Sequence, residues 1–229
     1  MDIKISPSKL SGTVEIPASK SYAHRALICA ALADGNSVIS GVTMSKDIEA
    51  TIGAMTALGA DFTVNNDSSI VVRGVNRSVS TAEIDCNESG STLRFIIPVA
   101  AALATKSEFF GRGRLPERPI DIYIRELSKN GIIFDYNNTM PFSIDGKLNS
   151  GVYEIEGDVS SQFITGLLFA LPLLEGDSVI KLTSKLESKP YADITIECLK
   201  RFGIEVTEID SDYIIKGGQK YHPCDLKVE

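Results

Sequence analysis

The chain has 229 residues, a hydrophobic content of 43% and a formal net charge of −7 at pH 7. That length and apolar content suffice for one large domain, or two small ones, with a proper core. The acidic balance and the lack of any Lys/Arg run argue against a nucleic-acid partner and indicate a small-molecule partner.

The cysteines and histidines give little material for a metal site. Four cysteines stand without CxxC spacing, and only two histidines occur. We therefore expect reduced core thiols, no metal and no cofactor. Residues 1–4 lead directly into alternating polar and apolar residues, and no apolar run reaches the ~18 residues of a membrane span. We expect a cytoplasmic protein without a signal peptide or membrane contact.

The pattern of apolar residues predicts a mixed α+β chain in which one order of elements recurs. The first unit is predicted to contain, in chain order, a strand at 14–16, a helix at 25–33, a strand at 37–40, a helix at 47–58 and a hairpin of 61–64 with 70–73. The second is predicted at 83–86, 92–104, 108–110, 120–129, 132–136 and 142–144, and the third at 152–155, 162–174, 179–182, 191–202, 205–208 and 213–216.

Three glycines make the repeat explicit. Gly59, Gly131 and Gly203 each follow a predicted helix and precede a strand, at a constant spacing of 72 residues. Glycine is favoured at such a helix end because the backbone there adopts a left-handed conformation. The equal spacing predicts three βαβαββ units, at about 13–75, 82–146 and 151–218, packed around buried helices as one lobe over 13–222.

The last residues, 226–229, alternate like 153–156, the start of the strand that opens the third unit. We therefore expect the chain to stop inside a fourth unit, as a fragment of a longer protein.

The first strand of every unit leads to a hydroxyl-rich helix start. The equivalent serines are Ser19, Ser89 and Ser160, at spacings of 70 and 71 residues. A helix N-terminus attracts anions, and a serine there either caps the helix or faces the anion. Cations accompany these starts at Lys20, Arg25 and Arg94, and Arg118 is held in a Glu-Arg-Pro sequence before another helix. The pattern indicates an anion pocket formed by converging helix starts.

These residues also resemble a known family, the 5-enolpyruvylshikimate-3-phosphate synthases. The resemblance lies in five motifs in order, namely PASKS with Arg25 (17–25), ESGSTLR (88–94), ERPI (117–120), GDVSSQF (157–163) and SKPYADIT (188–195). It implies an enzyme of the shikimate pathway that transfers the enolpyruvyl group of phosphoenolpyruvate to shikimate 3-phosphate and releases phosphate. It also implies a second, C-terminal lobe beyond this chain, with 1–12 belonging to that lobe and 223–229 starting the crossover to it.

The resemblance assigns roles residue by residue. Lys20 would position both substrates and Gln162 would contact both. Shikimate 3-phosphate would be held by Ser21, Arg25, Ser160, Ser161, Ser188 and Tyr191. Phosphoenolpyruvate would be held by Gly90 and Arg118, and symmetry would bring Ser188–Tyr191 near Arg118. Many relatives have Asn where this chain has Glu88, which weakens any expected contact from that position. The catalytic carboxylates would lie in the second lobe, so we expect this chain to be nearly inactive alone.

Two alternatives remain open. A UDP-N-acetylglucosamine enolpyruvyl transferase would share the fold, but its lysine is followed by Asn and its arginine loop carries a Cys, whereas Ser21 follows Lys20 here and 111–115 has no Cys. A non-catalytic anion-binding or scaffold module would use the serines only as helix caps.

Overall fold

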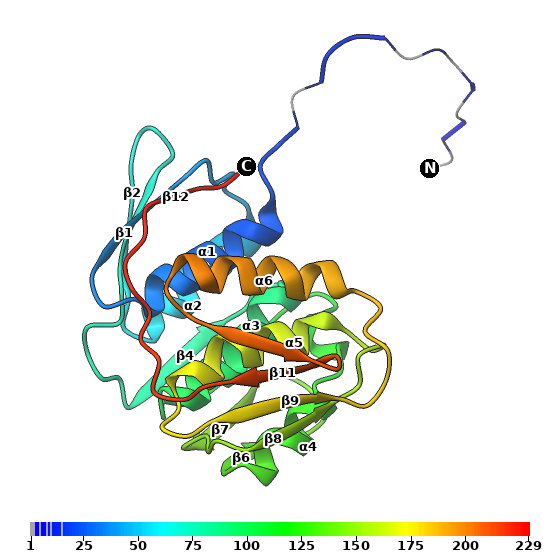
Figure 1. The fold of residues 1–229 in the computed structure, drawn as a ribbon. Coiled ribbons are helices and arrows are strands. Elements are labelled where there is room, and N and C mark those ends of the chain that lie inside the picture. The colour runs from blue at the N-terminus through cyan, green and yellow to red at the C-terminus, as the bar shows by residue number, and fades with distance from the viewer. Residues whose placement is uncertain (1–2, 5, 8, 10, 15) are drawn as a thin grey trace.

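The computed structural model describes residues 3–4, 6–7, 9, 11–14 and 16–229. Helices run through the body of the molecule with β-sheets around them, while the described residues at the start of the chain, ahead of α1 (Lys20–Leu32), extend away from the body (Figure 1). In the described part of the chain, no helix is long and apolar enough to cross a membrane.

The elements follow the predicted order. The first unit contains α1 (Lys20–Leu32), β1 (Asn36–Ser40), α2 (Lys46–Ala57), β2 (Asp61–Val64) and β3 (Ile70–Arg73). The second contains β4 (Thr81–Asp85), α3 (Gly90–Ala102), β5 (Lys106–Phe110), the 3-10 turn η1 (Leu115–Glu117), α4 (Asp121–Lys129), β6 (Ile132–Asp135) and β7 (Phe142–Gly146). The third contains β8 (Val152–Ile155), α5 (Ser161–Ala170), η2 (Leu171–Leu173), β9 (Ser178–Leu182), α6 (Lys189–Arg201), β10 (Val206–Ile209) and β11 (Asp212–Ile215).

The second and third units form four-stranded sheets with the same topology. The orders are β4-β5-β7-β6 and β8-β9-β11-β10, with the first two strands parallel and the rest antiparallel. The predicted α+β class and the βαβαββ order are therefore confirmed for these two units. Gly59, Gly131 and Gly203 have φ angles of 104°, 98° and 81°, which confirms the left-handed backbone expected at each helix end.

The first sheet departs from the prediction of a strand at 14–16. Val14 and Ile16 lie in no strand and are 84% and 89% exposed, and Glu15 lies outside the described residues. The sheet order is β12-β1-β3-β2, in which β12 (Leu226–Lys227) pairs parallel with β1 through Ile39 and Ser40. Strand β12 lies beside β1 (Figure 1) and takes the place that β4 and β8 hold in the other sheets, so the prediction that 226–229 lie inside a fourth unit is wrong.

Helix boundaries differ from the predictions for local reasons. Helix α1 begins at Lys20 and not at Arg25, because Ser19 caps it and no residue between them breaks the helix. Helix α5 stops at Ala170, four residues before the predicted end. The chain there tightens into the 3-10 turn η2, which carries Pro172.

The inner helices α1, α3 and α5 are joined by one polar residue from each outer helix. These residues are Thr51, Tyr123 and Thr195, each eight positions before the repeated glycine. Thr51 Oγ1 lies 2.7 Å from His24 Nδ1 of α1 and 2.8 Å from Thr92 Oγ1 of α3.

The same bridge recurs in the other two units. Tyr123 Oη donates to the carbonyls of Arg94 in α3 and Phe163 in α5, at 2.7 and 2.9 Å. Thr195 Oγ1 contacts Thr165 Oγ1 of α5 at 3.1 Å and accepts from Arg25 Nε of α1 at 2.7 Å. Each outer helix thus ties its own inner helix to the next one, and the three bridges close a ring.

The four cysteines are free thiols, and Cys29, Cys86 and Cys198 are buried. In the described residues no group of three His, Cys, Asp or Glu side chains could hold a metal ion.

Candidate functional site

The three equivalent serines cap their helices. Ser19 Oγ accepts from Tyr22 N at 3.3 Å, Ser89 Oγ from Thr92 N at 3.2 Å, and Ser160 Oγ from Gln162 N at 3.3 Å. Each cap satisfies one of the free N–H groups of its helix start. Ser160 was predicted to hold a phosphate, and in the structure its hydroxyl is engaged as a cap.

Arg25 is the centre of a first cluster. Its side chain is 3% exposed, lies with Cζ 5.3 Å from the centroid of the Phe95 ring, and donates to neutral oxygens from three helices. The acceptors are Ser21 O (2.6 Å), Thr195 Oγ1 (2.7 Å), Tyr191 O (3.1 Å) and Thr165 Oγ1 (3.3 Å). Burial lowers the pKa of Arg25 to about 10, because this environment solvates the cation poorly.

Three further predicted residues adjoin this cluster. Ser188 occupies the N-cap position of α6, where its hydroxyl makes no capping hydrogen bond, and Tyr191 is 48% exposed. Ser161 is buried in the first turn of α5, the helix that also carries Thr165. The structure attaches the Tyr191 backbone to Arg25 of α1, because Tyr191 O accepts from Arg25 Nη2 at 3.1 Å.

A second cluster surrounds the start of α3. The guanidinium of the exposed Arg118 lies over Gly90: a Cβ on that glycine would sit 2.1 Å from Arg118 Nη1. Gln162 Nε2 donates to Ser91 Oγ at 3.0 Å, and Gln162 Oε1 accepts from Arg94 Nη1 at 2.7 Å. The predicted residues Gly90, Arg118 and Gln162 are thus brought together at one helix start.

Lys20 and Glu88 stand at the margins of these clusters. Lys20 Nζ forms an ion pair with Asp47 Oδ2 at 2.5 Å, on side chains that are 55% and 33% exposed. The Glu88 carboxylate packs against Gly113, 2.6 Å from the position that a Cβ would take there. Glu88 is therefore turned toward the 111–115 loop.

The arginines of the site share one electrostatic property. Among the described residues, none of Arg25, Arg94 and Arg118 has a carboxylate within ion-pair distance. Two of them, Arg25 and Arg94, are buried. A buried cation without a counter-ion is costly, so this arrangement favours a bound anion.

His24 lies between the two clusters, with its Nδ1 on Thr51 and its buried Nε2 without a protein partner. Its ring meets Phe95 edge-on at 6.3 Å. Burial lowers the pKa of His24 to about 4, and Lys20 and Arg25 lower it further, while Asp47 opposes them. The ring is therefore neutral at physiological pH.

Sequence reasoning missed the supporting residues Thr51, Thr165 and Thr195. It identified Arg94 only as a cation near a helix start and assigned it no contact. The signal for two of them was present, because Thr51 and Thr195 occupy equivalent positions eight residues before Gly59 and Gly203. A polar residue repeated on the buried side of a helix indicates a hydrogen-bonded partner.

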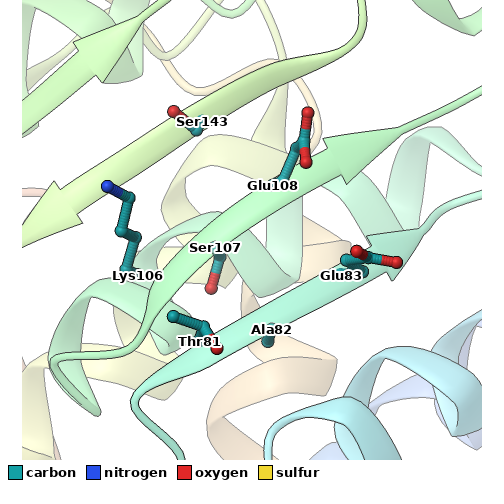
Figure 2. A pocket seen from close by; sticks show the side chains of 7 residues that line it. All are labelled: Thr81, Ala82, Glu83, Lys106, Ser107, Glu108 and Ser143. Carbon is teal, nitrogen blue, oxygen red and sulfur yellow. The ribbon is translucent and has the colours of Figure 1, made fainter.

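One hollow of the described surface lies elsewhere, away from these helix starts. It measures about 610 Å³ and opens on the outer face of the second sheet, where Lys106, Glu108 and Ser143 stand on neighbouring strands (Figure 2). Thr81 and Glu83 of β4 line its other side. Its charges are mixed and Lys106 is paired with Asp145 at 3.5 Å, so it lacks the unbalanced positive charge of the helix starts.

The fold and site define a lobe of three repeated α+β units with an anion-attracting face at the starts of its inner helices. A family model described as EPSP synthase (3-phosphoshikimate 1-carboxyvinyltransferase) matches residues 5–229. The chain belongs to the EPSP synthase family.

Relatives and solved structures agree with this assignment. The chain is 48% identical over 238 residues to the 3-phosphoshikimate 1-carboxyvinyltransferase of Clostridium beijerinckii, and 48% identical over 229 residues to that of Clostridium kluyveri. These matches cover 100% and 99% of the chain but 54% of each relative, so the chain spans about half their length. An EPSP synthase structure from Acinetobacter baumannii superposes with a TM-score of 0.80 at 22% identity, over 95% of this chain and 49% of that one.

Proposed function

We propose that this chain is the lobe of an EPSP synthase that binds shikimate 3-phosphate and phosphoenolpyruvate. The complete enzyme would transfer the enolpyruvyl group to the 5-hydroxyl of shikimate 3-phosphate and release phosphate. The observation that carries the proposal is a set of arginines at the helix starts, Arg25, Arg94 and Arg118, for which the described part of the chain supplies no carboxylate partner. Phosphate and carboxylate groups on the two substrates would supply the missing negative charge.

The grouping of the contacts supports two ligand sites. The cluster around Arg25 includes Ser21, Tyr191 and α5, which the resemblance assigns to shikimate 3-phosphate together with Ser160, Ser161 and Ser188. The cluster around Gly90 and Arg118 is assigned to phosphoenolpyruvate. Gln162 lies in α5 and is bonded to α3, which suits a residue that contacts both ligands.

In this proposal the described residues position substrates and stabilise charge. The reaction adds the hydroxyl, which gives up its proton to a base, to phosphoenolpyruvate while a proton goes to the methylene carbon. The tetrahedral intermediate then loses a proton from the new methyl group and expels phosphate, which restores the double bond. Both steps redistribute negative charge, and fixed guanidinium groups stabilise it without reorganising. The general acid and base are assigned by resemblance to the second lobe, which the chain itself does not include.

The non-catalytic alternative explains the serine caps but leaves the arginines without a role. Capping is worth about 1 kcal/mol per helix and needs no cation. A scaffold module would be more stable with apolar residues in place of Arg25 and Arg94.

Titration of the chain with each substrate, followed by 1H–15N NMR, tests the proposal. We expect shifts at the starts of α1, α3 and α5 with weak affinity, because an open half-site leaves the ligand solvated on one side. Phosphate release should be near background alone and rise when a separately made second lobe is added. No shift with either substrate at millimolar concentration, or full turnover by the chain alone, would contradict the proposal.

A further inference from the structure

Arg94 has an unusual environment for a cation. It lies in α3, its side chain is 8% exposed, and its guanidinium Cζ is 4.8 Å from the centroid of the Phe163 ring in α5. Burial lowers its pKa, and the neighbouring Arg118 lowers it further, while Tyr123 opposes the shift. A residue kept charged in such a place needs a reason beyond packing.

The two terminal nitrogens of the Arg94 guanidinium donate to two different parts of the chain, a side chain of α5 and the loop before α4. Nη1 donates to Gln162 Oε1 at 2.7 Å, and Nη2 donates to the carbonyl of Pro119 at 3.1 Å. Pro119 directly follows Arg118 in the chain. One rigid, planar group therefore contacts the neighbour of Arg118 and the side chain of Gln162.

Each contact continues to the start of α3. The Gln162 oxygen is taken by Arg94, so its amide nitrogen is turned to Ser91 Oγ at 3.0 Å. On the other side, the Arg118 guanidinium lies over Gly90. The contacts therefore form a closed ring. Arg94 connects Gln162 to the Arg118 loop on one side, and the start of α3 connects them on the other.

We propose that Arg94 is a positioning residue. It holds the Gln162 amide and the Arg118 loop in the positions that bind phosphoenolpyruvate. The inference rests on the proposed function for the identity of the ligand, but the positioning itself is a property of the free protein. A lysine at this place would keep the charge and lose the fork, because one ammonium group does not reproduce the two directed contacts.

Arg94→Lys tests the proposal, with Arg73→Lys as the matched control on an exposed β3 residue. In the ligand-free chain, we expect Arg94→Lys to shift the side-chain amide resonances of Gln162, assigned through Gln162→Glu. We expect its affinity for phosphoenolpyruvate to fall about tenfold, as for loss of one directed hydrogen bond to a charged group. Affinity for shikimate 3-phosphate should fall less than about threefold, because Arg25 is untouched. The control should change none of these.

Several results would overturn the inference. Unchanged Gln162 resonances and unchanged phosphoenolpyruvate affinity would show that Arg94 positions nothing. Equal loss of both ligands with a lower melting temperature would show a structural role only. If the unmodified chain binds neither substrate, the proposed function fails, and the Gln162 resonances of the free protein still decide whether Arg94 orients that side chain.

Discussion

The Arg118 guanidinium occupies the space that a side chain at Gly90 would fill. Arg118 Nη1 lies 2.1 Å from the position that a Cβ of residue 90 would take. A methyl group at residue 90 would force the arginine aside. Because Arg118 is exposed and flexible, the fold would absorb the change easily.

Gly90→Ala should therefore separate stability from binding. We expect the free energy of unfolding to stay within about 1 kcal/mol of the unmodified chain, since alanine is also favourable in a helix. Phosphoenolpyruvate binding should weaken at least about tenfold, because Arg118, the proposed partner of the ligand's carboxylate, is displaced. Urea denaturation and substrate titration measure the two quantities. Gly53→Ala, at an exposed glycine of α2 with nothing within 4 Å, is the control and should leave binding intact.

Arg25→Met should likewise cost affinity and little stability. The oxygens that Arg25 contacts keep other donors: Tyr191 O accepts from Thr195 Oγ1 at 2.7 Å, and Thr195 lies 3.1 Å from Thr165. Removing a buried cation without a counter-ion offsets the lost contacts, so we expect a change within about 1 kcal/mol. Shikimate 3-phosphate affinity should fall more than about tenfold. Arg73→Met is the control, and a large loss of stability with unchanged affinity would refute this account.

Replacement of glycine by alanine should change the free energy of unfolding in opposite directions in α5 and α2. A Cβ at Gly166, inside α5, would lie 2.2 Å from Tyr123 Oη and 2.3 Å from the Arg94 carbonyl, so α3 and α5 would have to separate. We expect Gly166→Ala to destabilise the chain by about 1–3 kcal/mol or more through overpacking. Gly53→Ala should stabilise it by about 0.5–1 kcal/mol. Thermal and urea unfolding decide, and a neutral Gly166→Ala would contradict the close helix contact.

The buried His24 should make stability depend on pH. Its folded pKa of about 4 lies below the ordinary 6.5, so the folded state binds fewer protons than the unfolded state in this range. His24 therefore costs nothing above pH 6.5 and progressively destabilises the fold as pH falls to 4, by about 3 kcal/mol in total. His24→Gln should remove this part of the acid destabilisation, whereas exposed His222→Gln should not. Urea unfolding between pH 7.5 and 4 measures it, and parallel curves for the two variants would exclude the effect.

Much of the architecture was predictable from local signals. The three glycines indicated the repeat because a left-handed helix end is a local backbone requirement. The roles of Gly90, Arg118 and Gln162 came from the family resemblance and not from local signals. The position of β12 was not predictable, because Val14–Ile16 and Leu226–Glu229 both alternate and only tertiary pairing decides between them. The bridges through Thr51 and Thr195 and the two-sided contact of Arg94 depend on helix packing across units, which periodicity does not encode.

The pairing of β12 with β1 also affects the order in which the units can fold during synthesis. The second and third units contain all four strands of their sheets within about 70 residues and can form as the chain emerges from the ribosome. The first unit is made earliest, yet β1 keeps an open edge until Leu226 and Lys227 arrive, and the Asp225 side chain that accepts from Val38 N comes 187 residues later. Of the three units, the one that is made first is thus the last to be completed, and β1 is an unpaired sheet edge, open to aggregation, until then.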